Sequence, residues 1–140
     1  MKCTISWTGD ARFVATTSSG HQVEMEGAAD LGGKNQHPRP MELILAGAGG
    51  CTAYDVVLIL KRGRHAVEGC EVHLSAERAE IDPKVFTHIH YHYVVRGHNL
   101  KKEIVERAIK LSAEKYCSAS IMLGKTAEIS HDFEIVNTAS

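Results

Sequence analysis

With 140 residues, 44% of them hydrophobic and 24% charged, the chain has the ordinary composition of one globular domain, and we expect a single domain over residues 1–140. The formal net charge of −1 at pH 7 gives no electrostatic footprint for nucleic acid or an anionic membrane, so neither is predicted as a partner. The N-terminal sequence lacks the charged-then-apolar pattern of a secretory signal. The four cysteines are therefore expected to be reduced thiols in the cytoplasm.

The first 39 residues favour a small sheet followed by a loop. Three short alternating segments are separated by turn residues, Gly9-Asp10 and Ser18-Ser19-Gly20, which is typical of an antiparallel meander. The predicted strands are Cys3–Thr8, Arg12–Thr17 and His21–Met25. Residues 27–39 are rich in glycine and polar residues and are expected to form a mobile loop; loops of this length are more often functional or disordered than idle.

The next segment, Pro40–Lys61 (PMELILAGAGGCTAYDVVLILK), predicts a helix that is apolar almost all round. Proline suits the first position of a helix, and Gly63 indicates where it stops. A helix of this kind is either buried on every side or lies in a membrane. Its two acidic residues, Glu42 and Asp55, and its three glycines favour the buried central helix of a soluble protein.

The remaining segments predict two strands, a second helix and a closing strand. The strands are Cys70–Arg78, Phe86–Val95 and Glu128–Val136. The helix is Leu100–Tyr116, with Asn99 as its N-cap. The order β-β-β-α-β-β-α-β predicts an α+β fold in which largely antiparallel sheets surround the long central helix.

This fold does not by itself explain how the apolar surface of the central helix is buried. Six short strands supply about one layer, whereas a helix that is apolar all round needs cover on every side. A homodimer in which two such helices share one core is the simplest solution, and two-fold pairs are the commonest oligomers. Small residues on the helix, Ala46, Gly47 and Gly50, would let a neighbouring backbone come close.

Two cysteines are the first candidates for chemistry. Cys51 lies in the central helix and Cys117 at the end of the second helix, and these helices are expected to pack together. They could form a peroxidatic thiol pair, or both could be small core residues. Asp55, one turn after Cys51, would disfavour a thiolate there, so a reactive Cys51 needs help from an arginine or from a distorted helix.

The histidines of FTHIHYHYVV, His88, His90 and His92, share one face of a strand. Such spacing can place two imidazoles on one metal ion, but no further ligand stands at a telling distance. A polar strand surface facing solvent is the favoured interpretation, and no metal site is predicted.

The block PMELILAGAGGC, followed far downstream by SAEKYCSAS, resembles the OsmC/Ohr family of hydroperoxide-reducing proteins over essentially the whole chain. The resemblance implies an OsmC-like, intertwined α+β homodimer with its two active sites at the subunit interface and no cofactor. It also implies roles for the cysteines. Cys51 matches the peroxidatic cysteine, which attacks an organic hydroperoxide and becomes a sulfenic acid, and Cys117 matches the resolving cysteine, which condenses with it to a disulfide.

The family relies on further groups. A dithiol reductant, typically a lipoyl group on a protein, restores the thiols, and a Glu–Arg pair stabilises the thiolate. In the family the glutamate directly follows the helix-leading proline, whereas here Met41 holds that position and Glu42 comes next. One residue is about 100° of helix, so Glu42 faces another direction. Glu42 is either catalytic or a first-turn carboxylate favoured by the helix dipole. Arg12 and Arg39 are the candidate arginines.

We therefore predict a cytoplasmic, thiol-dependent peroxidase of the oxidative or osmotic stress response that acts on organic or lipid-like hydroperoxides. Its apolar pocket would be lined by Met41, Leu45 and residues of the second helix. The alternative is a protein of the same fold that binds a small apolar ligand and has merely redox-sensitive cysteines. An arginine guanidinium that reaches Cys51 would distinguish the peroxidase.

Overall fold

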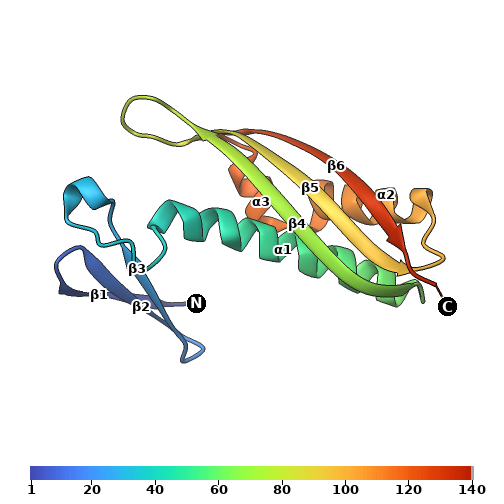
Figure 1. Ribbon diagram of the computed structural model, residues 1–140, viewed down its shortest axis with the longest axis horizontal. Helices are drawn as coiled ribbons and strands as arrows, with labels where there is room; N and C mark the ends of the chain where they lie inside the picture. The colour runs from blue at the N-terminus through green and yellow to red at the C-terminus, as the bar shows by residue number, and fades with distance from the viewer. Residues whose placement is uncertain (140) are drawn as a thin grey trace. The chain divides into compact units, whose positions relative to one another are not determined.

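The computed structural model describes residues 1–139 and divides the chain into two compact units (Figure 1). The N-terminal unit is Met1–Ala46, and the C-terminal unit begins at Gly47. The boundary falls inside the central helix, so one helix belongs to both units. Whether residues 1–140 fold as a single domain stays a prediction.

The N-terminal unit holds the predicted antiparallel meander. Its strands are β1 (Cys3–Gly9), β2 (Arg12–Thr17) and β3 (Gln22–Glu26), in the order β1-β2-β3. The turn between β1 and β2 requires positive φ at Gly9 (116°) and Asp10 (49°), where glycine and aspartate are tolerated best. All three predicted strands are confirmed, with boundaries within one residue.

The loop after β3 is held by one carboxylate, where the sequence predicted mobility. Glu26 is 2% exposed, and its carboxylate accepts hydrogen bonds from the backbone N–H groups of Lys34, Gln36 (2.7 Å) and His37 (2.9 Å). These donors, that of Lys34 first, lower the pKa of the Glu26 carboxyl. A short 3-10 helix, η1 (Ala29–Leu31), lies within the loop.

The central helix α1 (Pro40–Arg62) has the predicted start, and it ends just before Gly63. Its buried residues form one stripe at spacings of three and four: Ala48, Gly49, Thr52, Val56 and Leu60. Tyr54, on another side, is 68% exposed. A single chain therefore covers one face of the helix. By length and composition α1 could cross a membrane, a test that the core helix of a soluble protein also passes.

The C-terminal unit is built on a second sheet of three strands. These are β4 (Ala66–Arg78), β5 (Phe86–His98) and β6 (Glu128–Asn137), in the order β4-β5-β6. β4 and β5 are antiparallel, but β5 and β6 are parallel, so the expectation of antiparallel sheets needs correction here. The reason is the connection: helices between β5 and β6 carry the chain back to the end of the sheet where β5 began.

The predicted second helix is interrupted. It consists of α2 (Lys102–Leu111), a π-helical turn η2 (Ser112–Tyr116) and α3 (Ser118–Leu123). Asn99 is not the N-cap, because its φ of 53° is left-handed; Lys101 holds that position. The predicted end at Tyr116 is correct for the π-helical turn, and Cys117 lies at the following break.

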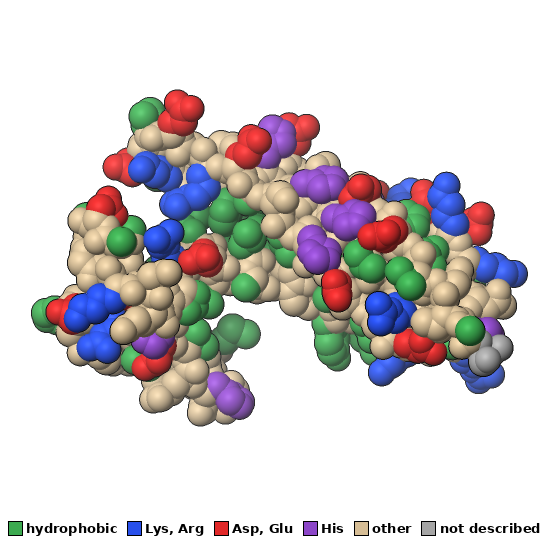
Figure 2. All heavy atoms as spheres, in the orientation of Figure 1, with side chains coloured by type: hydrophobic (Ala, Val, Ile, Leu, Met, Phe, Trp, Pro, Cys, Tyr) green, Lys and Arg blue, Asp and Glu red, His purple; other side chains and the backbone are tan. Residues whose placement is uncertain are grey.

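Alternation along β5 separates the core from the solvent face. Its inward side chains, Phe86, Ile89, Tyr91, Tyr93 and Val95, are buried against the helices. At Gly49 a Cβ would come within 2.7 Å of Leu74 Cδ1, so α1 lies very close to β4. The intervening histidines point outward, and Figure 2 shows histidine and acidic side chains gathered on this face.

Candidate functional site

The fold brings the two candidate cysteines together. The Sγ atoms of Cys51 and Cys117 and a carboxylate oxygen of Asp55 all lie within 4.8 Å of one another. Cys51 and Asp55 are one turn apart on α1, and Cys117 occupies the N-cap position of α3. Residues 66 positions apart in sequence thus meet inside the C-terminal unit.

Cys117 is fully buried and held by its neighbours. Its Sγ donates to Ser120 Oγ (3.0 Å), accepts from the Ser120 backbone N–H (3.4 Å) and lies 4.0 Å from the Ala48 carbonyl oxygen. Burial, above all, raises the pKa of the Cys117 thiol. Cys117 is therefore a protonated thiol at neutral pH, while Cys51 is partly accessible.

A chain of hydroxyl groups runs inward from Asp55. Ser112 Oγ donates to Asp55 Oδ2 (2.9 Å), and Thr52 Oγ1 lies 2.7 Å from both Ser112 Oγ and the Tyr93 hydroxyl. An ionised carboxylate only accepts, so Ser112 must receive its other hydrogen bond from Thr52, and Thr52 must receive one from Tyr93. The π-helical turn places Ser112 in this series of hydrogen bonds. The hydrogen bond from Ser112 orients the Asp55 carboxylate beside the sulfurs.

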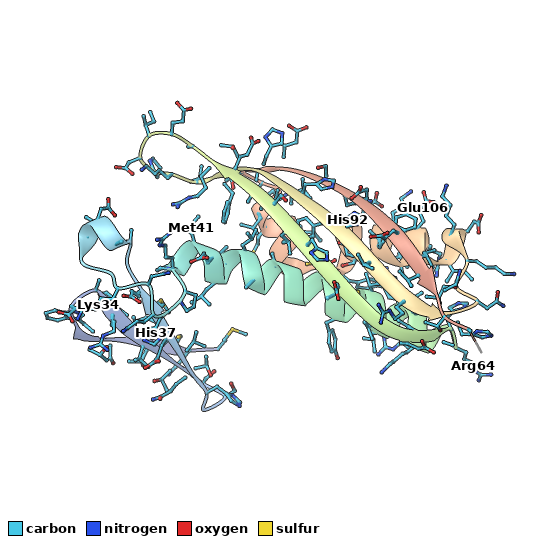
Figure 3. All side chains as sticks on the ribbon, viewed as in Figure 1. Lys34, His37, Met41, Arg64, His92 and Glu106 are labelled. Carbon is cyan, nitrogen blue, oxygen red and sulfur yellow. The ribbon has the colours of Figure 1, made fainter. Side chains whose placement is uncertain are left out.

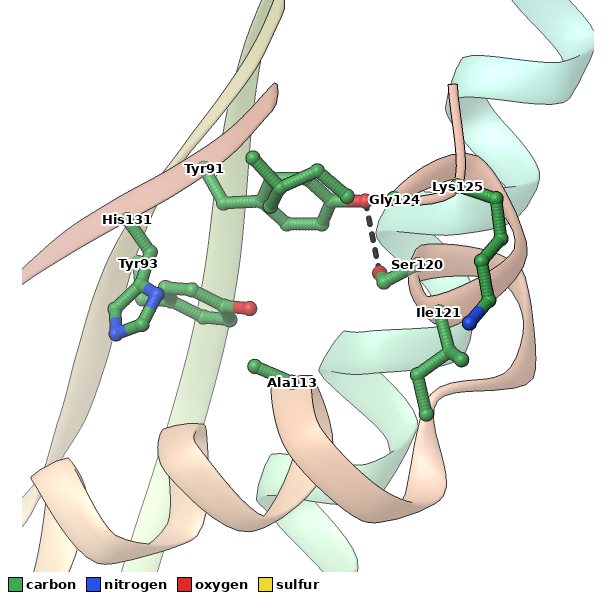
Figure 4. A pocket seen from close by; sticks show the side chains of 9 residues that line it. Tyr91, Tyr93, Ala113, Ser120, Ile121, Gly124, Lys125 and His131 are labelled. Atoms are coloured by element: carbon green, nitrogen blue, oxygen red, sulfur yellow. Dashed lines mark hydrogen bonds between the residues drawn. The ribbon is translucent and has the colours of Figure 1, made fainter. Parts of the chain in front are cut away.

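A second hydroxyl contact supports Cys117 from the sheet side. The Tyr91 hydroxyl lies 2.8 Å from Ser120 Oγ (Figure 4). Burial, as the largest cause, raises the pKa of Tyr91 and raises that of Tyr93 to about 12, so both phenols stay neutral. These tyrosines also line a cavity of about 280 Å³ (Figure 4); its other lining residues are Ala113, Ser120, Ile121, Gly124, Lys125, Ile129 and His131.

A larger hollow of about 360 Å³ adjoins the cysteines through Asp55, which forms part of its wall. Its lining mixes apolar side chains with charged ones, including two arginines; besides Asp55 the residues are Leu58, Ile59, Arg62, Gly63, Arg107, Leu111 and Tyr116. The hollow can hold an apolar group of a small ligand. Residues of α2 and of the π-helical turn contribute to its wall.

Three other predicted site residues lie in the N-terminal unit. Met41 is at the start of α1 (Figure 3), and neither it nor Leu45 lines the two cavities described above. Glu42 Oε1 accepts the backbone N–H of Arg39 at 3.0 Å. This is the reciprocal half of a capping box, in which a glutamate at the third helical position satisfies the N-cap donor.

The two candidate arginines also differ. Arg12, on β2, has a buried Nε without a hydrogen-bond partner within residues 1–139. Buried donors of this kind are rare and call for an explanation. Arg39 contributes its backbone N–H to the cap of α1. Of the remaining cysteines, Cys3 is exposed and Cys70 half-buried, and burial raises the Cys70 pKa.

The three histidines of β5 are paired with acids of neighbouring strands, as expected of a polar strand surface. His88 Nε2 lies 2.8 Å from Glu128, His90 Nε2 2.9 Å from Asp132, and His92 Nδ1 2.7 Å from Asp132. Figure 3 shows His92 on the sheet. Its hydrogen bond with Asp132, first, and then that with Glu134 raise its pKa. His92 in turn lowers the pKa of Asp132.

Sequence reasoning found Cys51, Asp55 and Cys117 but missed the hydroxyl groups around them. Thr52, Ser112 and Ser120 are common residues without motif spacing, so no sequence signal separates them from surface residues. Only the structure identifies them, because it shows that they are buried and a buried hydroxyl must find a hydrogen-bond partner.

Known proteins resemble this chain throughout its length. Protein YhfA of Escherichia coli strain K12 is 46% identical over 136 residues, 97% of this chain and 98% of that protein. A structure from structural genomics, 44% identical, has a TM-score of 0.91 and covers 99% of this chain and 100% of its own. The organic hydroperoxide resistance protein OhrB of Bacillus subtilis shares the fold, with a TM-score of 0.63 at 18% identity over 96% of this chain and 98% of its own. The family described as OsmC-like protein matches residues 33–132, and the chain belongs to this family.

Proposed function

We propose that this protein is a thiol-dependent peroxidase that reduces organic hydroperoxides through Cys51 and Cys117. The observation that carries the proposal is the meeting of the two sulfurs within 4.8 Å. A disulfide needs a sulfur–sulfur distance of about 2.05 Å, so the two sulfurs would have to approach each other by at most about 2.8 Å. The name of OhrB, which shares the fold, points to the same class of substrate.

The reaction has two chemical steps. The Cys51 thiolate attacks the distal oxygen of the hydroperoxide, the O–O bond breaks, and the leaving alkoxide takes a proton to become an alcohol. Cys51 is left as a sulfenic acid. The Cys117 sulfur then attacks the Cys51 sulfur, which releases water and forms the disulfide. A dithiol reductant such as a lipoyl protein then reduces this disulfide by thiol–disulfide exchange, so that both cysteines return to thiols and the reductant is left with its own disulfide.

The surroundings fit a division of roles between the cysteines. Cys51 is partly accessible and can meet the peroxide, whereas Cys117 is buried and protonated until the sulfenic acid forms. The hollow beside Asp55 offers apolar cover for the organic group of the substrate. Arg12 and Arg39 are the candidates for the arginine that stabilises the thiolate. We give Glu42 the role of capping α1.

The proposal includes a homodimer in the cytoplasm. The sides of α1 that one chain leaves uncovered would lie in the subunit interface, and there Tyr54 is more exposed than Ile44 (68% against 47%). This arrangement also makes α1 a core helix in a soluble protein.

The test is a titration of the reduced protein with one equivalent of cumene hydroperoxide, followed by peptide mapping without reductant. We expect a rapid, stoichiometric Cys51–Cys117 disulfide and one equivalent of alcohol. Cys117→Ser should stop at the sulfenic acid, which a dimedone reagent captures, and Cys70→Ser is the matched control that should react as the wild type. Thiols that stay free or oxidise at random would contradict the proposed peroxidase activity.

One observation favours a second candidate function, the binding of a small apolar ligand. Asp55 lies beside Cys51, and within residues 1–139 no lysine or arginine forms an ion pair with it. A carboxylate alone disfavours a neighbouring thiolate and so slows the first step. If the cysteines fail to react, the test is the binding of an apolar fluorophore. A fluorophore that binds the wild-type protein but not the Leu111→Arg variant, whose new side chain would fill the hollow, would support this function.

A further inference from the structure

The carboxylate of Asp55 has no part in the proposed peroxidase reaction. A peroxidatic cysteine is helped by positive charge, and Asp55 brings a negative charge within 4.8 Å of both sulfurs. The hydroxyl chain through Ser112 nevertheless fixes this carboxylate in place. An arrangement that holds a carboxylate against two thiols calls for a cation.

The three donor atoms have the chemistry and separation of a metal site. Two thiols and one carboxylate suit zinc and similar thiophilic divalent ions, whereas magnesium and calcium prefer oxygen ligands alone. Zinc–sulfur bonds of about 2.3 Å with tetrahedral angles put two sulfurs about 3.8 Å apart. From a separation of at most 4.8 Å, the sulfurs need to approach by no more than about 1 Å.

The ligands are also oriented by neighbouring groups. Asp55 Oδ2 accepts the Ser112 hydroxyl, and no hydrogen bond to Oδ1 is present among the described residues, so Oδ1 can face a metal ion. Cys117 Sγ accepts the Ser120 N–H, a donor that stabilises a thiolate. Hydrogen bonds of this kind fix ligand geometry in metal sites and tune affinity.

We propose that the reduced protein binds one thiophilic divalent cation of the zinc class through Cys51 Sγ, Cys117 Sγ and the Asp55 carboxylate. Two thiol protons leave to solvent on binding, so two thiolates and a carboxylate meet a doubly positive ion. The chain supplies three ligands, and a water molecule completes the four-coordinate site. The site uses the two cysteines of the proposed peroxidase but does not rest on that activity.

Metal binding and disulfide formation exclude each other. The disulfide consumes both sulfur ligands, and a bound metal ion occupies the electron pairs with which Cys51 would attack a peroxide. A bound ion would therefore protect the thiols, and oxidation of the thiols would release the ion.

Cobalt(II) is the probe, because thiolate ligands give it an intense ultraviolet charge-transfer absorbance and tetrahedral geometry gives it visible bands. The full-length, reduced, tag-free protein is titrated without oxygen. We expect absorbance that saturates at one Co²⁺ per chain and disappears when Zn²⁺ is added. Absence of a thiolate charge-transfer band would overturn the proposal.

Variants locate the ligands. Cys51→Ser and Cys117→Ser should each lose most of the charge-transfer absorbance. Asp55→Asn should weaken binding by at least ~10-fold, the lower end of what even an outer-shell change costs. Cys70→Ser is the matched control and should bind as the wild type. Charge transfer that survives in the Cys51→Ser/Cys117→Ser double variant would also overturn the site.

A measurement on the wild type needs no variant to fold. Zn²⁺ should slow alkylation of Cys51 by iodoacetamide and leave that of exposed Cys3 unchanged. Equal rates with and without Zn²⁺ would contradict the site. The peroxide titration is a separate readout on the same protein: cobalt binding without a peroxide-formed disulfide supports the metal site alone, and the reverse result supports the peroxidase alone.

Discussion

The two sheets of this protein differ in how their apolar faces are covered. In the C-terminal unit, the inward side chains of β5 are buried beneath the helices. In the N-terminal unit, the strand register places six apolar side chains on one face of β1-β2-β3: Ile5, Trp7, Phe13, Ala15, Val23 and Met25. Of these only Ala15 is buried, and Trp7 is 68% exposed.

This difference shows that the C-terminal unit contains a core of its own, whereas the N-terminal sheet presents an apolar face that needs a cover. An isolated three-stranded sheet gains little stability unless its apolar face is covered. The other face, with Thr4, Ser6, Thr16 and Glu24, is polar, so the sheet has the alternation of a half-buried element. The proposed homodimer would supply the cover.

The largest expected effect is a difference in the stability lost by a leucine-to-alanine substitution in each of the two units. Leu60→Ala removes a fully buried side chain of α1 and should lower the free energy of unfolding by ~2–5 kcal/mol. The matched control, Leu31→Ala, changes a side chain that is 78% exposed and should stay within ~0.5 kcal/mol. Urea unfolding followed by circular dichroism measures both. Equal losses would contradict the placement of the core.

The next effect tests the exposed apolar face. Phe13→Lys should weaken self-association by ~30-fold, equivalent to a hot-spot loss of about 2 kcal/mol. Thr4→Lys, on the polar face, is its control and should have little effect. Sedimentation equilibrium gives the dissociation constants. The sole tryptophan, Trp7, adds a label-free readout, since its emission should shift to the red when the wild type is diluted into monomers.

A smaller effect concerns the hydroxyl chain in the C-terminal unit. Thr52→Val keeps the shape but leaves the hydroxyl groups of Tyr93 and Ser112 short of a partner, which should destabilise the protein by ~1–3 kcal/mol. Thr16→Val, at an exposed position of β2, is the control. Thermal unfolding compares the pair.

The smallest effect lies on the solvent face of the second sheet. The raised pKa of His92 means that its contribution to stability is fully present below the ordinary value of 6.5 and is lost as the pH rises through the raised value. The lowered pKa of Asp132 makes its contribution present above 3.8 and lost as the pH falls through the lowered value. The pair therefore stabilises most between these two ordinary values.

Proton NMR titration checks this contribution. The His92 midpoint should lie above 6.5 in the wild type and fall in Asp132→Asn, because Asp132 is the larger cause of the shift. Glu134→Gln should lower the midpoint less. A midpoint that does not respond to Asp132→Asn would contradict the pairing.

The sequence alone determined the local elements and the family. Turn residues between alternating segments defined the three N-terminal strands, and Pro40 and Gly63 bounded α1, because these signals depend on backbone preferences within a few residues. The spacing of Cys51 and Asp55 gave their common helix face. The cysteine blocks gave the OsmC-like membership, which the relatives confirm.

Only the tertiary structure decided the rest. The parallel pairing of β6 depends on the path of the helices before it, and the break of the second helix at Ser112 depends on what its hydroxyl meets in the core. The approach of Cys117 to Cys51 and Asp55 joins residues far apart in sequence, which no local pattern specifies. These features arise from packing between distant segments, where buried polar groups must find partners and apolar faces must find cover.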